Sequence, residues 1–142
     1  MAQNIQSLWS PDIKATVLSP LTILKGQAEA LALQTGGVLL AEIVEDHEEA
    51  DVSLSLDLVA PALQGSRHRI LRVVHKDGLP YPATVEAEVF NGGMPPWKRA
   101  YTDHQFTKTV AEVLKSSQVL SIAQSLVARA NEALEKNGSA EQ

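Results

Sequence analysis

The residues from Asp51 to Val59 alternate strictly between apolar and polar side chains, and this pattern constrains the fold more than any other. The apolar set is Val52, Leu54, Leu56 and Leu58, and the polar set is Ser53, Ser55 and Asp57. Because successive side chains of a strand point to opposite faces, an extended chain buries one set and leaves the other exposed. The segment therefore predicts a half-buried antiparallel strand.

Three more segments have the composition of strands: residues 38–45, 67–75 and 81–90. The last of them is expected to turn small apolar side chains inward, namely Ala83, Val85, Ala87 and Val89. The Asp77-Gly78 pair suits the positive φ of a tight turn between the third and fourth segments. Together the four strands are predicted to form an antiparallel meander.

Two registers compete for the first hairpin. One places Glu42 opposite Leu54 on the buried face, whereas a shift by one residue places Ala41 and Ile43 against the leucines and leaves Glu42 free. An unpaired buried carboxylate is costly, and no residue in the sequence is an evident partner for it. We therefore expect the shifted register, with the acidic residues 46–50 as the hairpin loop.

A helix is expected over residues 20–35. Ser19 supplies an N-cap oxygen, Pro20 suits the first helical position, and Gly36-Gly37 suits the left-handed backbone that closes a helix. Its predicted core stripe is Leu21, Leu24, Ala28, Leu31 and Ala32.

Two more helices are expected near the C-terminus. Thr102 and Gln105 fit a capping box, and this helix should end at Ser116-Ser117. The third should run from there to Asn137-Gly138. Between the strands and these helices, residues 91–101 read NGGMPPWKRAY and predict an eleven-residue loop, since paired glycines and prolines disfavour regular structure.

The predicted fold is an α+β two-layer sandwich with the order α-β-β-β-β-α-α. Its four-stranded antiparallel sheet is covered on at least one face by the helices. The 142 residues fit one domain over residues 1–136. Residues 1–18 are expected to be an arm that docks through Leu8, Trp9 and Ile13, and residues 137–142 a flexible tail.

Composition excludes several classes of function. The chain has no cysteine, which removes disulfides, thiolate zinc sites and cysteine nucleophiles, and the common nucleotide, hydrolase and metalloprotease motifs do not occur. Its net charge of -5 disfavours nucleic acid as a partner. Because no leader-like or bilayer-length apolar run occurs, we expect a cytoplasmic protein that does not bind membranes.

The strongest charge feature is the basic strand with Arg67, Arg69 and Arg72. One interpretation is an anion site for phosphate, nucleotide or nucleic acid, because guanidinium groups bind oxyanions in a bidentate fork. The alternative, which we favour, is cross-strand pairing with Glu86 and Glu88.

Two other clusters contain groups that can carry chemistry. His75 and Asp77 could perform acid–base work in a small hydrolase or phosphate-ester enzyme if they faced one cleft with the arginines. The acidic residues 46–51 contain possible metal ligands, but the spacing fits neither an EF-hand nor a zinc site. A solvated turn and a solvated hairpin tip explain these clusters better, so no metal or cofactor is expected.

The loop containing Met94, Trp97, Lys98 and Arg99 is the favoured binding surface. Tryptophan and arginine are enriched at interface hot spots, although Trp97 could instead cover one end of the core. We therefore predict a non-catalytic protein-binding or adaptor module, with Arg67, Arg69, Arg72 and His75 as further candidate contacts. The two-sided apolar first strand and the apolar last helix also suggest a homodimer or a partner protein.

Overall fold

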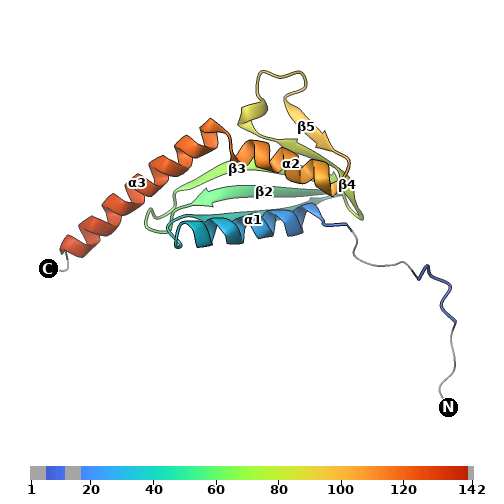
Figure 1. Ribbon diagram of the computed structural model, residues 1–142, viewed down its shortest axis with the longest axis horizontal. Helices are drawn as coiled ribbons and strands as arrows, with labels where there is room; N and C mark the ends of the chain where they lie inside the picture. Colours follow the sequence, from blue (N-terminus) through green and yellow to red (C-terminus); the bar gives the residue numbers. More distant parts are fainter. Residues whose placement is uncertain (1–5, 12–16, 141–142) are drawn as a thin grey trace, which may run out of the picture.

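The computed structural model describes residues 6–11 and 17–140, except for the side chains of the last four, and confirms an antiparallel α+β architecture (Figure 1). The elements are α1 (Pro20–Gln34), β1 (Leu40–Glu48), β2 (Asp51–Val59), β3 (Arg67–Lys76), β4 (Leu79–Glu86), the 3-10 helix η1 (Glu88–Phe90), β5 (Trp97–Ala100), α2 (Asp103–Leu114) and α3 (Ser117–Ala140). The sheet has five strands, so the prediction of four was wrong in this respect.

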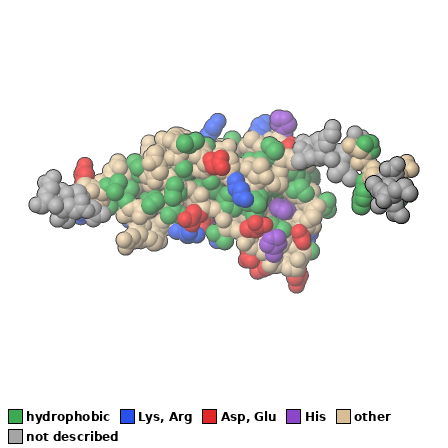
Figure 2. Space-filling view, turned by 90° about the horizontal axis from the view of Figure 1, so that it is seen from below, with side chains coloured by type: hydrophobic (Ala, Val, Ile, Leu, Met, Phe, Trp, Pro, Cys, Tyr) green, Lys and Arg blue, Asp and Glu red, His purple; other side chains and the backbone are tan. Residues whose placement is uncertain are grey.

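The sheet is a meander in which each strand pairs with the next in sequence order. Helices α1 and α2 lie over one face, and α3 leads away from them beyond the end of the sheet (Figure 1). The core lies between the helices and this face of the sheet, where Leu24, Leu54, Val73 and Phe106 are fully buried. Seen from below, the surface carries hydrophobic side chains in small groups with charged side chains between them (Figure 2).

The first hairpin adopts the expected register. Ala41 lies opposite Leu58 and Ile43 opposite Leu56, so both face the core, while Glu42 lies opposite Asp57 on the open face of the sheet. The prediction of a loop over residues 46–50 was wrong, because β1 continues to Glu48 and β2 starts at Asp51. Only two residues connect the strands.

A bulge interrupts the pairing of β2 with β3. Leu56 lies opposite Leu71, but Asp57 lies opposite Arg69, so Ile70 is an extra residue in β3. In a regular strand Ile70 and Leu71 would point to opposite faces, yet both are buried. The inserted residue shifts the alternation, and Arg67 and Arg69 therefore share the open face with Asp57.

The fourth strand is shorter than predicted, and a fifth strand follows it. β4 ends at Glu86, and the next residues turn away as η1. The expected loop over residues 91–101 is confined to residues 91–96, because Trp97–Ala100 returns as β5 and pairs with β4. The prolines come before this pairing, so they do not interrupt it.

The cap signals placed the helix starts correctly. Ser19 Oγ accepts the Thr22 N–H at 3.3 Å, and Thr102 Oγ1 accepts the Gln105 N–H at 3.1 Å. The break between α2 and α3 is also confirmed, and Ser116 Oγ accepts the Val119 N–H there at 3.3 Å. However, α3 continues to Ala140 instead of ending at Asn137-Gly138. A single glycine costs a helix only about 1 kcal/mol, which is too little to end it by itself.

A clamp of two side chains fixes the chain just before α1. Asp103 Oδ2 accepts the Leu18 N–H at 3.0 Å, and the Tyr81 hydroxyl donates to the Leu18 carbonyl at 2.7 Å. Leu8 and Trp9 further upstream are 96% and 79% exposed, so they do not dock as predicted. The expected contact of Ile13 lies outside the described residues.

Within the described residues, no helix is both long enough and apolar enough to cross a bilayer.

Candidate functional groove

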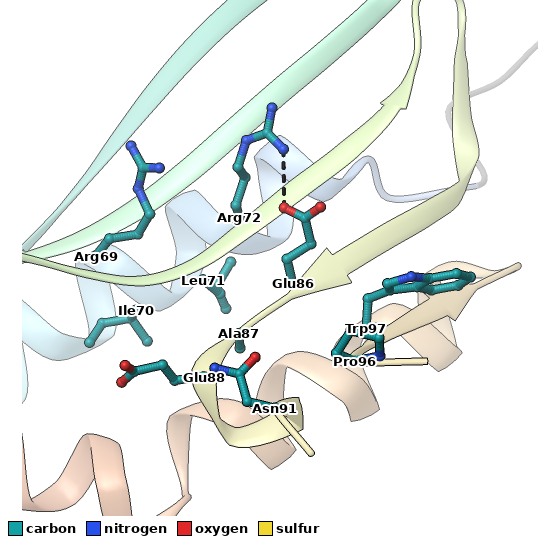
Figure 3. A pocket seen from close by; sticks show the side chains of 10 residues that line it. All are labelled: Arg69, Ile70, Leu71, Arg72, Glu86, Ala87, Glu88, Asn91, Pro96 and Trp97. Atoms are coloured by element: carbon teal, nitrogen blue, oxygen red, sulfur yellow. Dashed lines mark hydrogen bonds and ion pairs between the residues drawn. The ribbon is translucent and has the colours of Figure 1, made fainter. Parts of the chain in front are cut away.

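A groove opens where β4 ends and β3 continues. β4 pairs with β3 only as far as the Arg72–Glu86 pair, so residues 67–71 have a described strand partner on the β2 side alone. The space left by β4 is a groove of about 480 Å³. Its lining residues are Arg69, Ile70, Leu71, Arg72, Glu86, Ala87, Glu88, Asn91, Pro96 and Trp97 (Figure 3).

The two sides of β3 give the groove different surfaces. Arg69 and Arg72 project from the strand to one side, whereas Ile70 and Leu71 project to the other (Figure 3). Ile70 and Leu71 are buried and form an apolar floor, while Arg67, His68 and Arg69 are exposed. The groove therefore combines an exposed strand end, two guanidinium groups and an apolar base.

Two of the predicted arginines are held by carboxylates on other strands of the sheet. Arg72 Nη1 donates to Glu86 Oε2 at 3.0 Å, and Arg72 Nε donates to Ser53 Oγ at 3.1 Å. Arg67 contacts the Glu42 carboxylate and donates through Nη1 to Asp57 Oδ2 at 3.2 Å. The expected pairing with Glu88 does not occur among the described residues. Arg67 and Arg72 thus stabilise the sheet's open face.

Arg69 is less engaged than these two arginines. Its Nε lies 3.9 Å from Asp57 Oδ1, and its side chain is 62% exposed. Asp57 itself is only 4% exposed, and Oδ1 has no hydrogen-bond partner within the described residues. The alternation of residues 51–59 predicts Asp57 on the polar face, but residue type alone does not mark it as the anchor of the arginines. Arg69 keeps the freedom to meet a second carboxylate.

The four loop residues predicted to form one binding surface lie in different surroundings in the structure. Trp97 is half-buried at the end of the groove, and the Arg99 guanidinium lies 5.0 Å from the centre of its ring. Lys98 turns to the helix side, where its ammonium contacts both Glu112 oxygens at 2.8 Å. Met94 is 97% exposed on the loop before β5. Of this set, Trp97 lines the groove directly.

His75 and Asp77 lie away from the groove. His75 pairs with Val52 toward the other end of β3, and its Nδ1 lies 2.8 Å from the Lys76 carbonyl oxygen. Asp77 is in the turn before β4, where its N–H donates to the Ala50 carbonyl. Neither residue lines the groove with the arginines. The described residues also include no group of three or more His, Asp or Glu side chains that could hold a metal ion.

The groove brings three kinds of chemical group together. They are the start of β3, which has no described strand partner on its β4 side, the guanidinium of Arg69 and the half-buried ring of Trp97. Comparisons with protein families, with curated proteins and with solved structures found no match for the chain.

Proposed function

We propose that the protein is a non-catalytic binding module that takes up an extended segment of a partner protein in the groove beside β3. This proposal rests on the different extents of two neighbouring strands. β3 begins at Arg67, but β4 reaches only as far as its pairing with Arg72. The exposed start of β3 is therefore the place where another strand can add to the sheet.

Strand addition would use the main-chain hydrogen-bonding groups at the exposed start of β3. An added strand lies about 4.8 Å from its neighbour and exchanges main-chain hydrogen bonds with it. Arg67, His68 and Arg69 are exposed and have a strand partner on one side. Residues 87–91 leave the sheet and do not occupy this position. A partner segment of a few extended residues fits beside them.

The side chains of the groove favour a segment that alternates acidic and apolar residues. Successive side chains of an added strand point to opposite faces. On the open face they meet Arg69, whose contact with Asp57 is long. On the other face they meet the apolar floor of Ile70 and Leu71. Trp97 at the groove's end supplies the residue type that most often forms a binding hot spot.

The enzyme alternative has less support from this arrangement. It requires His75 and Asp77 to share a cleft with the arginines, and these residues lie at the opposite end of β3. The nucleic-acid alternative is also weakened, because Arg67 and Arg72 are engaged by carboxylates.

A titration with short synthetic peptides tests the proposal. The probe is a capped hexapeptide of alternating glutamate and valine, and binding is followed by amide chemical shifts of the labelled protein. We expect saturable shifts at residues 67–72 and Trp97. The same peptide with N-methyl groups on alternate residues should bind much more weakly, because it loses main-chain donors.

Charge reversal supplies the second arm of the experiment. Arg69→Glu should lower the affinity for the glutamate peptide by about fivefold and favour a lysine–valine peptide instead. Lys108→Glu on α2 makes the same charge change away from the groove and should leave both affinities unchanged. Equal binding of the N-methylated and unmodified peptides would rule out strand addition.

A further inference from the structure

A second cavity lies on the helix side of the sheet, separate from the groove. It occupies about 400 Å³ between α1, the end of α2 and the start of α3. The floor is formed by apolar side chains of three strands, namely Ala41, Leu56, Leu58 and Ile70. This helix-side trough has the volume of a typical small-molecule site, about 300 to 1,000 Å³.

The walls of the trough are also apolar. Leu31 on α1 faces Val119 and Ala123 on α3, and Leu120 on the same helix is 54% exposed. A long aliphatic chain placed here would remove apolar surface from water on both sides, which is the main source of favourable free energy for such a ligand.

The polar side chains of the trough indicate which chemical group could bind beside its apolar walls. They are Gln27, Gln34 and Lys115, and none of the described side chains that line the trough is acidic. Lys115 forms no ion pair with an acidic side chain in the described part of the chain. Lys115 is therefore a cation beside an apolar cavity with no acidic partner among the described residues, although the protein as a whole has a net charge of -5.

We infer that the trough binds an aliphatic monocarboxylic acid of medium length. Its carboxylate would pair with the Lys115 ammonium and accept hydrogen bonds from the glutamine amides, while its hydrocarbon chain lies over the leucines of β2. This inference does not depend on the groove, because the two sites use different polar residues and share only Ile70 among their lining residues.

Calorimetric titration with decanoate below its micelle concentration tests the assignment, with decanol as the uncharged counterpart. We expect one saturable decanoate site. Lys115→Ala should weaken decanoate about three- to tenfold and leave decanol unchanged. Lys108→Ala removes a cation on α2 outside the trough's lining and serves as the matched control.

Filling the cavity tests the location. Ala123→Phe should abolish binding of both probes, whereas Ala128→Phe, on an exposed position of α3 outside the lining, should not. If Ala123→Phe does not fold, Ala30→Trp at the exposed rim of α1 takes its place. Absence of saturable decanoate binding, or binding that survives the filled cavity, would overturn the inference. An equal effect of Lys115→Ala on decanoate and decanol would overturn the choice of a carboxylate.

Discussion

The Asp57 carboxylate lies beneath the side chains of Arg67 and Arg69 on the open face of the sheet. It accepts a hydrogen bond from Arg67, and Glu42 contacts the same guanidinium from β1. The three arginines of β3 on this face therefore have three carboxylates within ion-pair distance, with Glu86 holding Arg72. Within the described residues, Arg67 and Arg72 thus have close carboxylate partners, and Arg69 has a looser one.

This balance predicts how the protein behaves toward nucleic acid. The unmodified protein should show no affinity for labelled single-stranded DNA at low salt, as measured by fluorescence anisotropy. The double variant Glu42→Gln/Asp57→Asn releases the arginines and should acquire salt-dependent binding, because cation–phosphate contacts displace counterions. Glu132→Gln/Glu135→Gln on α3 changes the charge equally and should not. DNA binding by the unmodified protein would contradict the account.

Trp97→Ala separates a binding role from a structural one. Because Trp97 is half-buried at a sheet edge, its loss should lower the free energy of unfolding by about 1–2 kcal/mol, less than a core tryptophan. Affinity for the glutamate–valine peptide should fall by at least about 2 kcal/mol. Tyr101→Ala, which truncates an exposed aromatic residue, is the control. A loss of stability of about 3 kcal/mol with unchanged peptide affinity would make Trp97 a core residue only.

For the helices and strands, features that depend on neighbouring residues could be predicted from the sequence, whereas features that depend on contacts between distant segments could not. The helix starts were predicted correctly from Ser19 and Thr102, because an N-cap depends on only a few neighbouring residues. The bulge at Ile70 and the pairing of β5 depend on contacts between strands, so composition gave no sign of them. Arg69, Arg72 and Trp97 could be singled out by residue type, but their convergence follows from where β4 ends.

The clamp on Leu18 joins three elements that are distant in sequence. The hydrogen bond from the Leu18 N–H is the main reason why the pKa of Asp103 lies below its ordinary value, and the His104 N–H adds to it. Burial raises the pKa of Tyr81 to about 12, and the negative charge of Asp103 contributes further. The tyrosine hydroxyl therefore remains a donor across the physiological pH range.

Asp103→Asn should weaken this clamp in a pH-dependent way. Because the pKa of Asp103 is lower in the folded protein than in the unfolded chain, the contact stabilises the fold at pH values above the unfolded pKa of about 3.9. That contribution is lost as the pH falls through the folded value. The difference in unfolding free energy between the natural protein and the variant, measured by urea denaturation, should thus disappear in strong acid. Glu132→Gln should give no such difference, and a difference for Asp103→Asn that persists in acid would contradict the role of the charge.

At the scale of the whole molecule, the helices cover one face of the sheet and leave apolar residues on their outer surface. On the last helix, whose apolar side chains suggested an interface, Leu126 is buried within the chain, whereas Leu120 and Leu134 are 54% and 53% exposed. Leu33 at the end of α1 is 84% exposed. The proposed association surface is therefore smaller than the sequence suggested and centres on α3.

Light scattering at micromolar concentration tests association through α3. A homodimer is expected for the natural protein, and Leu134→Asp should shift it toward the monomer by placing a charge in the apolar contact. Gln124→Asp adds the same charge at an exposed polar position of α3 and should leave the mass unchanged. A monomeric mass at every accessible concentration would leave a different protein as the only candidate to cover these leucines.

If the start of β3 accepts an added strand, amide hydrogen exchange at that strand end should respond to the peptide. Backbone amides alternate in direction along a strand, so within residues 67–69 at least one should point away from β2 and exchange rapidly in the free protein. Saturation with the glutamate–valine peptide should slow that amide by tenfold or more while leaving Leu54 and Val73 unchanged. Unaltered exchange at residues 67–69 in the saturated complex would contradict the account.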